Sequence, residues 1–299
     1  MSVGVRHGAR GVGDDLIARF GRAFAHLTQA PSLKPIAIAL SGGSDSTALL
    51  HLARLSLPHS RLVALTVDHG LRPESTSEAQ AVQRTMQALG VTHHLLHWQH
   101  GGTPSGNLQA EARKARYRLM SEACRREGIE YLLLGHTEDD QAETIAFMQT
   151  RASGAVGLAG MSARREMNGI TLLRPLLGFS RAELRHWLQA QSIRWIDDPS
   201  NENEDFTRIR LRRELQADPA RKAELLALGR QMEPQRLQIE QRHAEFCRQY
   251  ATLDENTLHC PVEMLLALGE AQAAYTLGRM IQHIGGQEYP PRYAKRLRC

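Results

Sequence analysis

Lysine and cysteine are scarce in this sequence of 299 residues. Only four lysines and four cysteines occur, and the cysteines are far apart with no C-x-x-C pair. This spacing argues against a zinc ribbon, a redox motif or a disulfide framework. The sequence also has no run of about 18 apolar residues and no continuous apolar segment near its start. We therefore predict a cytoplasmic protein that does not associate with a membrane.

Two common nucleotide-binding signatures are also missing. The sequence contains neither the Gly-Lys-Ser/Thr of a Walker A loop nor a G-x-G-x-x-G dinucleotide fingerprint. A glycine- and serine-rich turn stands between an apolar run, residues 36–40, and a helix-like run, residues 47–53. The turn consists of Ser41, Gly42, Gly43, Ser44, Asp45 and Ser46.

This turn has the chemistry of a phosphate site. The first N–H groups of a helix lack internal partners, and the helix dipole attracts anions to them. Gly42 and Gly43 allow positive φ and close approach of a ligand. The serine hydroxyls can donate to phosphate oxygens, and Asp45 is a candidate Mg²⁺ ligand. The alternative is a tight strand-to-helix turn without a ligand.

The lysine-free S-G-G-x-D-S pattern resembles the pyrophosphate loop, or PP-loop, of the N-type ATP pyrophosphatases. Members of that superfamily split ATP between its α and β phosphates. The resemblance implies that residues 41–46 bind ATP. We use the name PP-loop for these six residues below.

Strand-like and helix-like runs alternate through the first two thirds of the sequence. The predicted strands are 36–40, 61–67, 91–98 and 131–134, with an edge strand at 170–177. Such alternation predicts right-handed crossovers and an α/β fold. We expect a Rossmann-like open parallel sheet with helices on both faces.

The predicted domains follow the same pattern. Residues 1–13 are expected to be disordered, 14–216 to form the catalytic domain, and 217–299 to form a smaller helical domain. The helical domain is predicted to break at Pro234 and around 256–261, and its unfinished last stretch suggests truncation. Within the catalytic domain, Ser75 with Glu78 and Ser180 with Glu183 have the spacing of helix capping boxes.

Three polar segments follow predicted strands: the PP-loop, residues 68–69 and residues 136–140. Ligands of open parallel sheets bind beyond the carboxyl ends of the strands, so these segments should meet. In a helix, His136 lies four residues from Asp140, so the two share a face. Carboxylates beside a phosphate loop can hold Mg²⁺, bind an ammonium group or act as bases. The alternative is an acidic helix N-terminus favoured by the dipole.

Six motifs together make the resemblance more specific. They are SGGSDS (41–46), VDHGLR (67–72), EARKARY (111–117), GHTEDDQAET (135–144), RPLL (174–177) and DDPSN (197–201). Their order and separations resemble the tRNA(Ile)-lysidine synthetase family over about residues 36–215, whereas the helical C-terminal part is only loosely similar. The sequence departs from the family at 208–210, where arginine-isoleucine replaces the usual arginine-asparagine, and in the glycine-rich stretch 151–161.

The resemblance implies a ligase that joins free L-lysine to carbon 2 of the wobble cytidine of tRNA(Ile) with a CAU anticodon. ATP and Mg²⁺ are the implied cofactors, and AMP and pyrophosphate the implied products. Asp45 and Asp140 are the candidate metal ligands. Arg113 and His136 are the candidates for neutralising charge at the α-phosphate, and Glu143 with Asp140 for holding lysine or accepting its proton. A homodimer is compatible with the sequence.

The remaining candidate residues are polar or basic. Asp68 is expected to orient ATP or the activated base. The net charge of +5 and the arginine surplus suggest a polyanionic partner, although the composition of the source genome would explain them equally well. The candidate tRNA contacts are Arg116, Tyr117, Arg151, Arg208, Arg210 and Arg212, and the last three also fit a solvated basic face.

Three other functions remain as alternatives. Another PP-loop enzyme that thiolates a tRNA base would need paired thiols if it used cysteine or a metal cluster. An ATP-dependent amide synthetase would need a source of ammonia, and nothing in the sequence resembles a glutaminase. A non-catalytic ATP- or RNA-binding module would keep the PP-loop without the carboxylates of residues 138–143.

Overall fold

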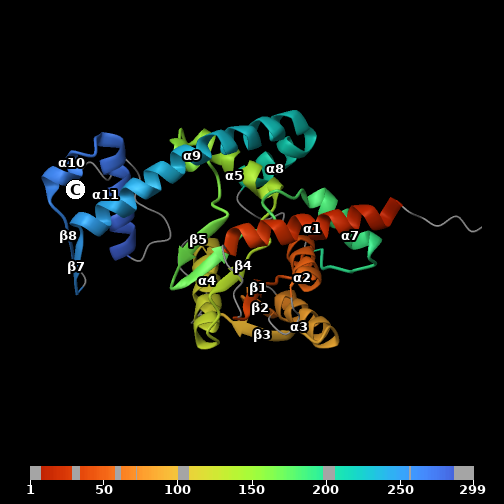
Figure 1. The fold of residues 1–299 in the computed structure, drawn as a ribbon. Helices are drawn as coiled ribbons and strands as arrows, with labels where there is room; N and C mark the ends of the chain where they lie inside the picture. The colour runs from red at the N-terminus through yellow and green to blue at the C-terminus, as the bar shows by residue number, and fades with distance from the viewer. Residues whose placement is uncertain are drawn as a thin grey trace, which may run out of the picture. The chain divides into compact units, whose positions relative to one another are not determined.

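A computed structural model describes residues 8–28, 34–57, 62–71, 73–99, 108–197, 206–255 and 257–285. The chain divides into two compact units (Figure 1). The first unit comprises Met1–Phe147 and Met161–Leu226, and the second comprises Met148–Gly160 and Ala227–Cys299. The domain boundary predicted at residue 217 stays a prediction. No helix within the described ranges is long and apolar enough to cross a membrane.

The first unit is built on a six-stranded sheet in the order β3-β2-β1-β4-β6-β5. Five strands are parallel: β1 (Ile36–Ala39), β2 (Leu62–Asp68), β3 (Thr92–His97), β4 (Tyr131–Leu133) and β6 (Ile170–Leu173). Strand β5 (Arg164–Met167) pairs antiparallel with β6. The predicted Rossmann-like α/β fold is confirmed.

The edge of this sheet differs from the prediction. The strand expected at the edge, β6, lies inside the sheet between β4 and β5. The true edge strand, β5, has the sequence Arg-Arg-Glu-Met. It contains one apolar residue, so no alternation of apolar and polar side chains indicates a strand there. Charged residues are typical of exposed edge strands because they discourage pairing with another chain.

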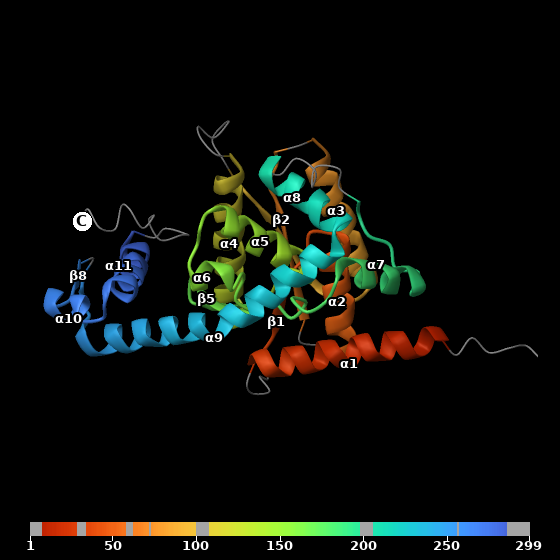
Figure 2. The same cartoon turned by 90° about the horizontal axis from the view of Figure 1, so that it is seen from above.

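Helices cover both faces of the sheet (Figure 2). The helices of the first unit are α1 (Gly8–Thr28), α2 (Ser44–Ser56), α3 (Pro73–Ala88), α4 (Leu108–Arg126), α5 (Glu138–Thr150), α7 (Arg181–Ala190), α8 (Phe206–Ala217) and the start of α9 (Pro219–Tyr250). Because side chains alternate along a strand, Ile36 and Ile38 face α1, α2 and α7, whereas Ala37 faces α4.

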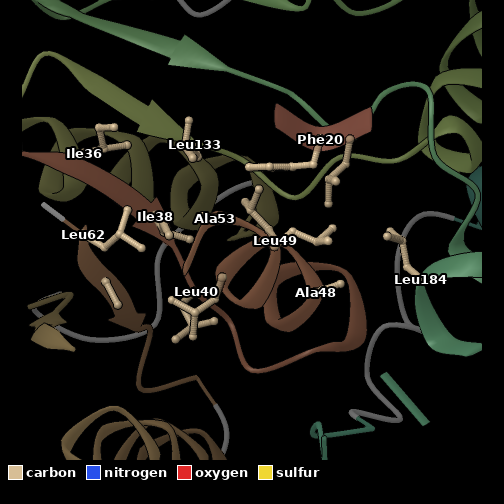
Figure 3. Packing of buried hydrophobic residues seen from close by; sticks show 14 of the residues in the cluster. Phe20, Ile36, Ile38, Leu40, Ala48, Leu49, Ala53, Leu62, Leu133 and Leu184 are labelled. Atoms are coloured by element: carbon tan, nitrogen blue, oxygen red, sulfur yellow. The ribbon is translucent and has the colours of Figure 1, made fainter. Parts of the chain in front are cut away.

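Each face of the sheet carries a hydrophobic core, and the larger core contains much of α2, the helix that follows the PP-loop (Figure 3). Leu49 of α2 is fully buried with Phe20 of α1, Ile38 of β1 and Leu184 of α7. Full burial of each such side chain contributes about 1.5–3 kcal/mol. The helix that carries Asp45 at its first turn is therefore anchored on several sides.

Some helix starts differ from the predicted ones. Helix α1 begins at Gly8, and residues 1–7 of the segment expected to be disordered lie outside the described residues. Helix α3 begins at Pro73, a favourable first position for proline, so the capping box predicted at Ser75 is wrong. The capping box of Ser180 with Glu183 is confirmed, with both reciprocal hydrogen bonds present.

The second unit is mostly helical. It contains α6 (Ala155–Leu158), α9 from residue 227, a hairpin of β7 (Thr252–Asp254) and β8 (Thr257–His259), α10 (Val262–Leu266) and α11 (Glu270–Ile284). The break predicted at Pro234 is wrong because α9 continues through it. Proline removes only one N–H donor, and the buried Arg236 fixes the next turn by donating to the carbonyl of Gly160.

Candidate nucleotide and cation site

The PP-loop leads from β1 into α2 and is braced by its own serines. The Ser46 hydroxyl donates to the carbonyl of Gly43 at 3.1 Å and accepts from the N–H of Ser41 at 3.2 Å. Gly42 has a φ of +89°, whereas Gly43 has a φ of −68° and caps α2 in an extended conformation. Of the two glycines expected to need positive φ, only Gly42 does.

Substitution of Gly42 tests this difference. A Cβ added at Gly42 would lie 2.9 Å from both Ile196 and Val82, in a backbone conformation that is itself strained for alanine. We expect Gly42→Ala to lower the free energy of unfolding by about 2–4 kcal/mol. Gly43→Ala is the matched control and should change it by less than about 1 kcal/mol. Urea denaturation of both variants measures the difference, and equal losses would contradict this account.

The segment after β4 passes directly against the start of α2. A Cβ on Gly135 would lie 3.1 Å from the backbone nitrogen of Ser46 and 3.2 Å from the carbonyl carbon of Asp45. A side chain at this position would force the backbone at the start of α2 to shift by a few tenths of an ångström. The close approach of this segment brings His136 and the first turn of α5 beside the PP-loop, as the sequence predicted for segments at neighbouring strand ends.

Three carboxylates meet at the side chain of Arg181, the first residue of α7. Its Nε donates to Asp45 Oδ2 at 2.9 Å, and its Nη2 donates to Asp140 Oδ1 at 2.8 Å. Its Nη1 lies 3.9 Å from Glu143 Oε1. We call Asp45, Asp140, Glu143 and Arg181 the cation cluster. The structure thus brings together the PP-loop aspartate and both of the predicted α5 carboxylates.

Burial sets the charge balance of the cation cluster. Burial raises the pKa of Asp45 although Arg181 opposes the shift. Burial likewise raises the pKa of Glu143 against the hydrogen bond and charge of Arg212. Both carboxyls therefore hold their protons more tightly than usual. The positive charge of Arg181 offsets part of this cost of burial.

A small pocket adjoins the cation cluster and carries both signs of charge. It is lined by Asp139, Ala142, Glu143, Arg181, Arg212, Leu215, Gln216 and Lys222. Arg212 of α8 donates from Nε to Glu143 at 2.9 Å, so this predicted tRNA contact lies at the pocket. Lys222 pairs with Asp139 at 2.9 Å and Glu138 at 3.0 Å.

His136 lies beside buried basic residues. Its Nδ1 accepts a hydrogen bond from Arg174 Nε at 3.1 Å. Burial and the charge of Arg174 lower the pKa of His136 to about 4, so the ring is neutral at pH 7. His136 therefore offers a hydrogen bond rather than a positive charge, and its role at the α-phosphate stays a prediction. Arg113 donates to the Tyr117 hydroxyl at 3.4 Å and stacks over that ring.

Asp68 is engaged in shaping the chain after β2. Its carboxylate accepts hydrogen bonds from the N–H of Gly70 and from the hydroxyls of Ser75 and Thr76, at 2.8–2.9 Å. Burial alone would raise the pKa of Asp68, but these hydrogen bonds lower it. A role for Asp68 toward ATP or the activated base stays a prediction.

The other predicted tRNA contacts are scattered. Arg116 donates to His69 Nε2 at 3.0 Å, and Arg210 is exposed on α8. Arg151 is exposed in the second unit, and the side chain of Arg208 lies outside the described residues. Tyr117 lies on α4 and its side chain is buried in the core, which argues against direct contact with tRNA.

Two residues that sequence reasoning missed are Arg174 and Arg181. Arg174 was inside the RPLL motif, whose order in the chain was noted without a role for its arginine. The capping box at Ser180 marked Arg181 as the first residue of a helix. Neither pattern shows which way a side chain points, so no local signal places Arg181 against Asp45, 136 residues away.

The fold and the PP-loop define a PP-loop domain, and residues 16–218 match the family model described as PP-loop domain. The tRNA(Ile)-lysidine synthase of Ruegeria pomeroyi is 39% identical over 278 residues, which cover 89% of this chain and 65% of that protein. The enzyme of the same name from Hyphomonas neptunium is 37% identical over 266 residues, 86% of this chain and 71% of that protein. The chain belongs to the tRNA(Ile)-lysidine synthase family.

Two further comparisons concern the length of the chain and its fold. The tRNA(Ile)-lysidine synthase of Bradyrhizobium diazoefficiens is 46% identical over 193 residues, which cover 63% of this chain and 52% of that protein. The chain thus spans about half to two thirds of the length of several curated relatives. The U34-tRNA thiolase NcsA from Methanococcus maripaludis superposes with a TM-score of 0.59 at 16% identity, covering 74% of this chain and 80% of that one. That likeness shows the shared fold.

Proposed function

We propose that this chain ligates L-lysine to carbon 2 of the wobble cytidine of CAU-anticodon tRNA(Ile), with ATP converted to AMP and pyrophosphate. The observation that carries the proposal is the cation cluster beside the PP-loop, in a chain of the tRNA(Ile)-lysidine synthase family. The reaction needs a phosphate cradle and a site for cations next to each other. The PP-loop and the cation cluster, which both lie within the first unit, are suited to these two roles.

The first step activates the base. A cytosine carbonyl oxygen is a poor leaving group, so the oxygen attacks the α-phosphate of ATP, forms an adenylated cytidine and expels pyrophosphate. The N–H groups at the start of α2 are suited to hold the outgoing pyrophosphate. Arg113 and the neutral His136 are suited to stabilise charge on the α-phosphate, as a positive group and a hydrogen-bond donor.

The residues of the cation cluster fit a magnesium ion. Mg²⁺ is usually held by one or two carboxylates together with phosphate oxygens and water. Asp45 and Asp140 already face one positively charged group, the Arg181 guanidinium. They would hold the ion once Arg181 releases them. When bound, Mg²⁺ supplies charge neutralisation on the phosphates.

The second step joins lysine to the base. The lysine amine attacks carbon 2 of the adenylated cytidine, forms the carbon–nitrogen bond and releases AMP. With a reference pKa near 10.4, producing the neutral amine at pH 7 costs about 4.6 kcal/mol. Glu143 suits the role of base because burial already raises its pKa.

One incubation tests the proposal. The protein is mixed with ATP, Mg²⁺, labelled lysine and tRNA(Ile) with a CAU anticodon. We expect label in the tRNA and one AMP per lysine incorporated. The matched control is the same tRNA with uridine at the wobble position, which should accept no lysine. A folded, ATP-binding protein that transfers no lysine to the CAU tRNA would refute the proposal.

Binding of tRNA should depend steeply on salt. Each phosphate contact contributes about −0.9 to the slope of log K against log salt on duplex nucleic acid, and about −0.7 on a single strand. We expect Arg116→Ala to make the slope shallower by about one unit. Arg118→Ala is the control on the same helix, because Arg118 is exposed and pairs with Glu122. Filter binding at several salt concentrations measures the slope for both variants. An affinity for tRNA that does not change with salt would show that the arginines do not form a phosphate-binding surface.

The alternative of base thiolation receives no support from the cysteines. Cys124 is buried in the core, and burial raises the pKa of its thiol to about 12. Cys247 and Cys260 are partly buried and pack against the core of the second unit. In the described part of the chain, no cysteine lines the pocket or belongs to the cation cluster.

A further inference from the structure

Arg174 is a buried arginine that makes no ion pair in the described ranges. Its side chain is 5% exposed and follows directly after β6. Its Nη1 donates to the carbonyl of Ser162 at 2.6 Å. The Nε donates to Nδ1 of His136 at 3.1 Å. A buried charge without a counterion is costly, so a specific function is the natural reason to keep it.

The hydrogen bond from Arg174 determines where the His136 proton sits. A guanidinium has five N–H donors and no acceptor. The Nδ1 of His136 must therefore accept, and it carries no proton while this hydrogen bond exists. A neutral imidazole has one N–H, which is then on Nε2. In the described part of the chain, no protein atom accepts a hydrogen bond from Nε2.

We propose that Arg174 is a positioning residue that holds His136 as the neutral Nε2–H tautomer, with Nε2 directed to donate to a phosphate oxygen of the nucleotide. The choice of phosphate rests on the proposed function, in which the α-phosphate reacts. The tautomer rests only on the contacts of this structure. Arg174 thereby acts on the reaction through His136, without touching the substrate itself.

The charges around His136 agree with this assignment. Burial and the charges of Arg174, Arg113 and Arg116 lower the pKa of the ring, whereas the charge of Asp140 raises it. The pKa of about 4 keeps His136 neutral throughout the pH range in which such enzymes are assayed. A neutral donor of fixed tautomer does not lose its proton to the reaction. It can stabilise developing charge without acting as an acid.

Nuclear magnetic resonance of histidine-labelled protein tests the tautomer without any activity. Long-range ¹H–¹⁵N correlations distinguish Nε2–H from Nδ1–H, and His136→Gln identifies the signal of this ring. We expect His136 to show a protonated Nε2 and a bare Nδ1 from pH 5 to pH 8. A protonated Nδ1, or titration with a pKa near 6.5 in the folded protein, would overturn the proposal.

Arg174→Met should remove the hydrogen bond that Nδ1 of His136 accepts. We expect the His136 pKa to rise from about 4 toward 6.5, since both the donor and its positive charge are removed. Arg125→Met is the matched control, because Arg125 is exposed on α4 and should leave the His136 signal unchanged. Thermal unfolding checks that each variant is folded. Arg174→Lys keeps one donor and the charge, so it should leave the His136 pKa low. If Arg174→Met does not fold, Arg174→Leu replaces it, because leucine also removes both the donor and the charge. A His136 signal unchanged in either folded variant would contradict the proposal.

Two substitutions of His136 test the donor in the reaction. Glutamine places an N–H near the position of Nε2, whereas asparagine reaches only to the position of Nδ1. We expect His136→Gln to retain at least about tenfold more AMP formation than His136→Asn, with a similar KM for ATP. Equal activities would refute Nε2 as the donor. If the wild-type protein made no lysidine but showed the Nε2–H tautomer, the proposed function would fail while the positioning by Arg174 would stand.

Discussion

Asp45→Asn should reduce AMP formation at least about a thousandfold while leaving the protein folded. Asp45 lies in the first turn of α2, at the PP-loop, and shares Arg181 with Asp140. Asparagine keeps the shape of the side chain but removes the negative charge that a magnesium ion requires. The measurement is AMP and pyrophosphate release with saturating tRNA and lysine. Turnover within tenfold of wild type would remove Asp45 from the metal role.

The stability of this variant should change in the opposite direction. The pKa of Asp45 is raised in the folded protein, so its contribution to stability is complete below its unfolded pKa and is lost as pH rises through the folded value. At pH 7 the ionised carboxylate therefore costs stability, and asparagine removes that cost together with the pairing to Arg181, which keeps its ion pair with Asp140. We expect an unchanged or higher midpoint of thermal unfolding. Asp254→Asn, at an exposed position of β7, is the control for both measurements.

The fold was predictable where local pattern and tertiary context agree. Strands β1, β2 and β4 read as apolar runs because both of their faces are covered by helices. The charged strand β5 could not be found by the same rule, because its pairing with β6 decides its conformation. Local helix propensity likewise predicts a break at Pro234, although the helix continues there. Packing around Arg236 keeps α9 continuous through that position.

The candidate site was predictable in its parts and less so in its connections. The PP-loop and the α5 carboxylates were expected to meet because each follows the carboxyl end of a strand, and the contact at Gly135 brings them together. Arg181 comes from a helix that starts far along the chain, so sequence spacing carries no information about its contacts. The charge state of His136 likewise depends on Arg174, which is 38 residues away. The residue types thus indicated the chemistry, whereas the folded structure shows which side chains pair with each other.

Glu143→Gln should separate the two steps of the proposed reaction. Glu143 is buried on α5, accepts from Arg212 at 2.9 Å and lies at the edge of the cation cluster. It is well placed to bind the lysine amine, whereas Asp45 and the PP-loop are the groups placed for ATP. We expect lysine incorporation to fall at least about a hundredfold. Pyrophosphate release in a single turnover with tRNA should stay within about threefold of wild type.

The pH dependence of the same variant gives an independent readout. If Glu143 accepts the proton of lysine, the wild-type rate of lysine incorporation must fall as pH drops through the raised pKa of Glu143, because the protonated carboxyl cannot act as a base. Glutamine does not titrate, so its residual rate should lose that acidic limb and depend only on the lysine amine. Glu130→Gln, a partly exposed position that pairs with Lys34, should reproduce the wild-type profile. An acidic limb that persists in Glu143→Gln would assign the base to another group, with Asp140 the nearest carboxylate of the cation cluster.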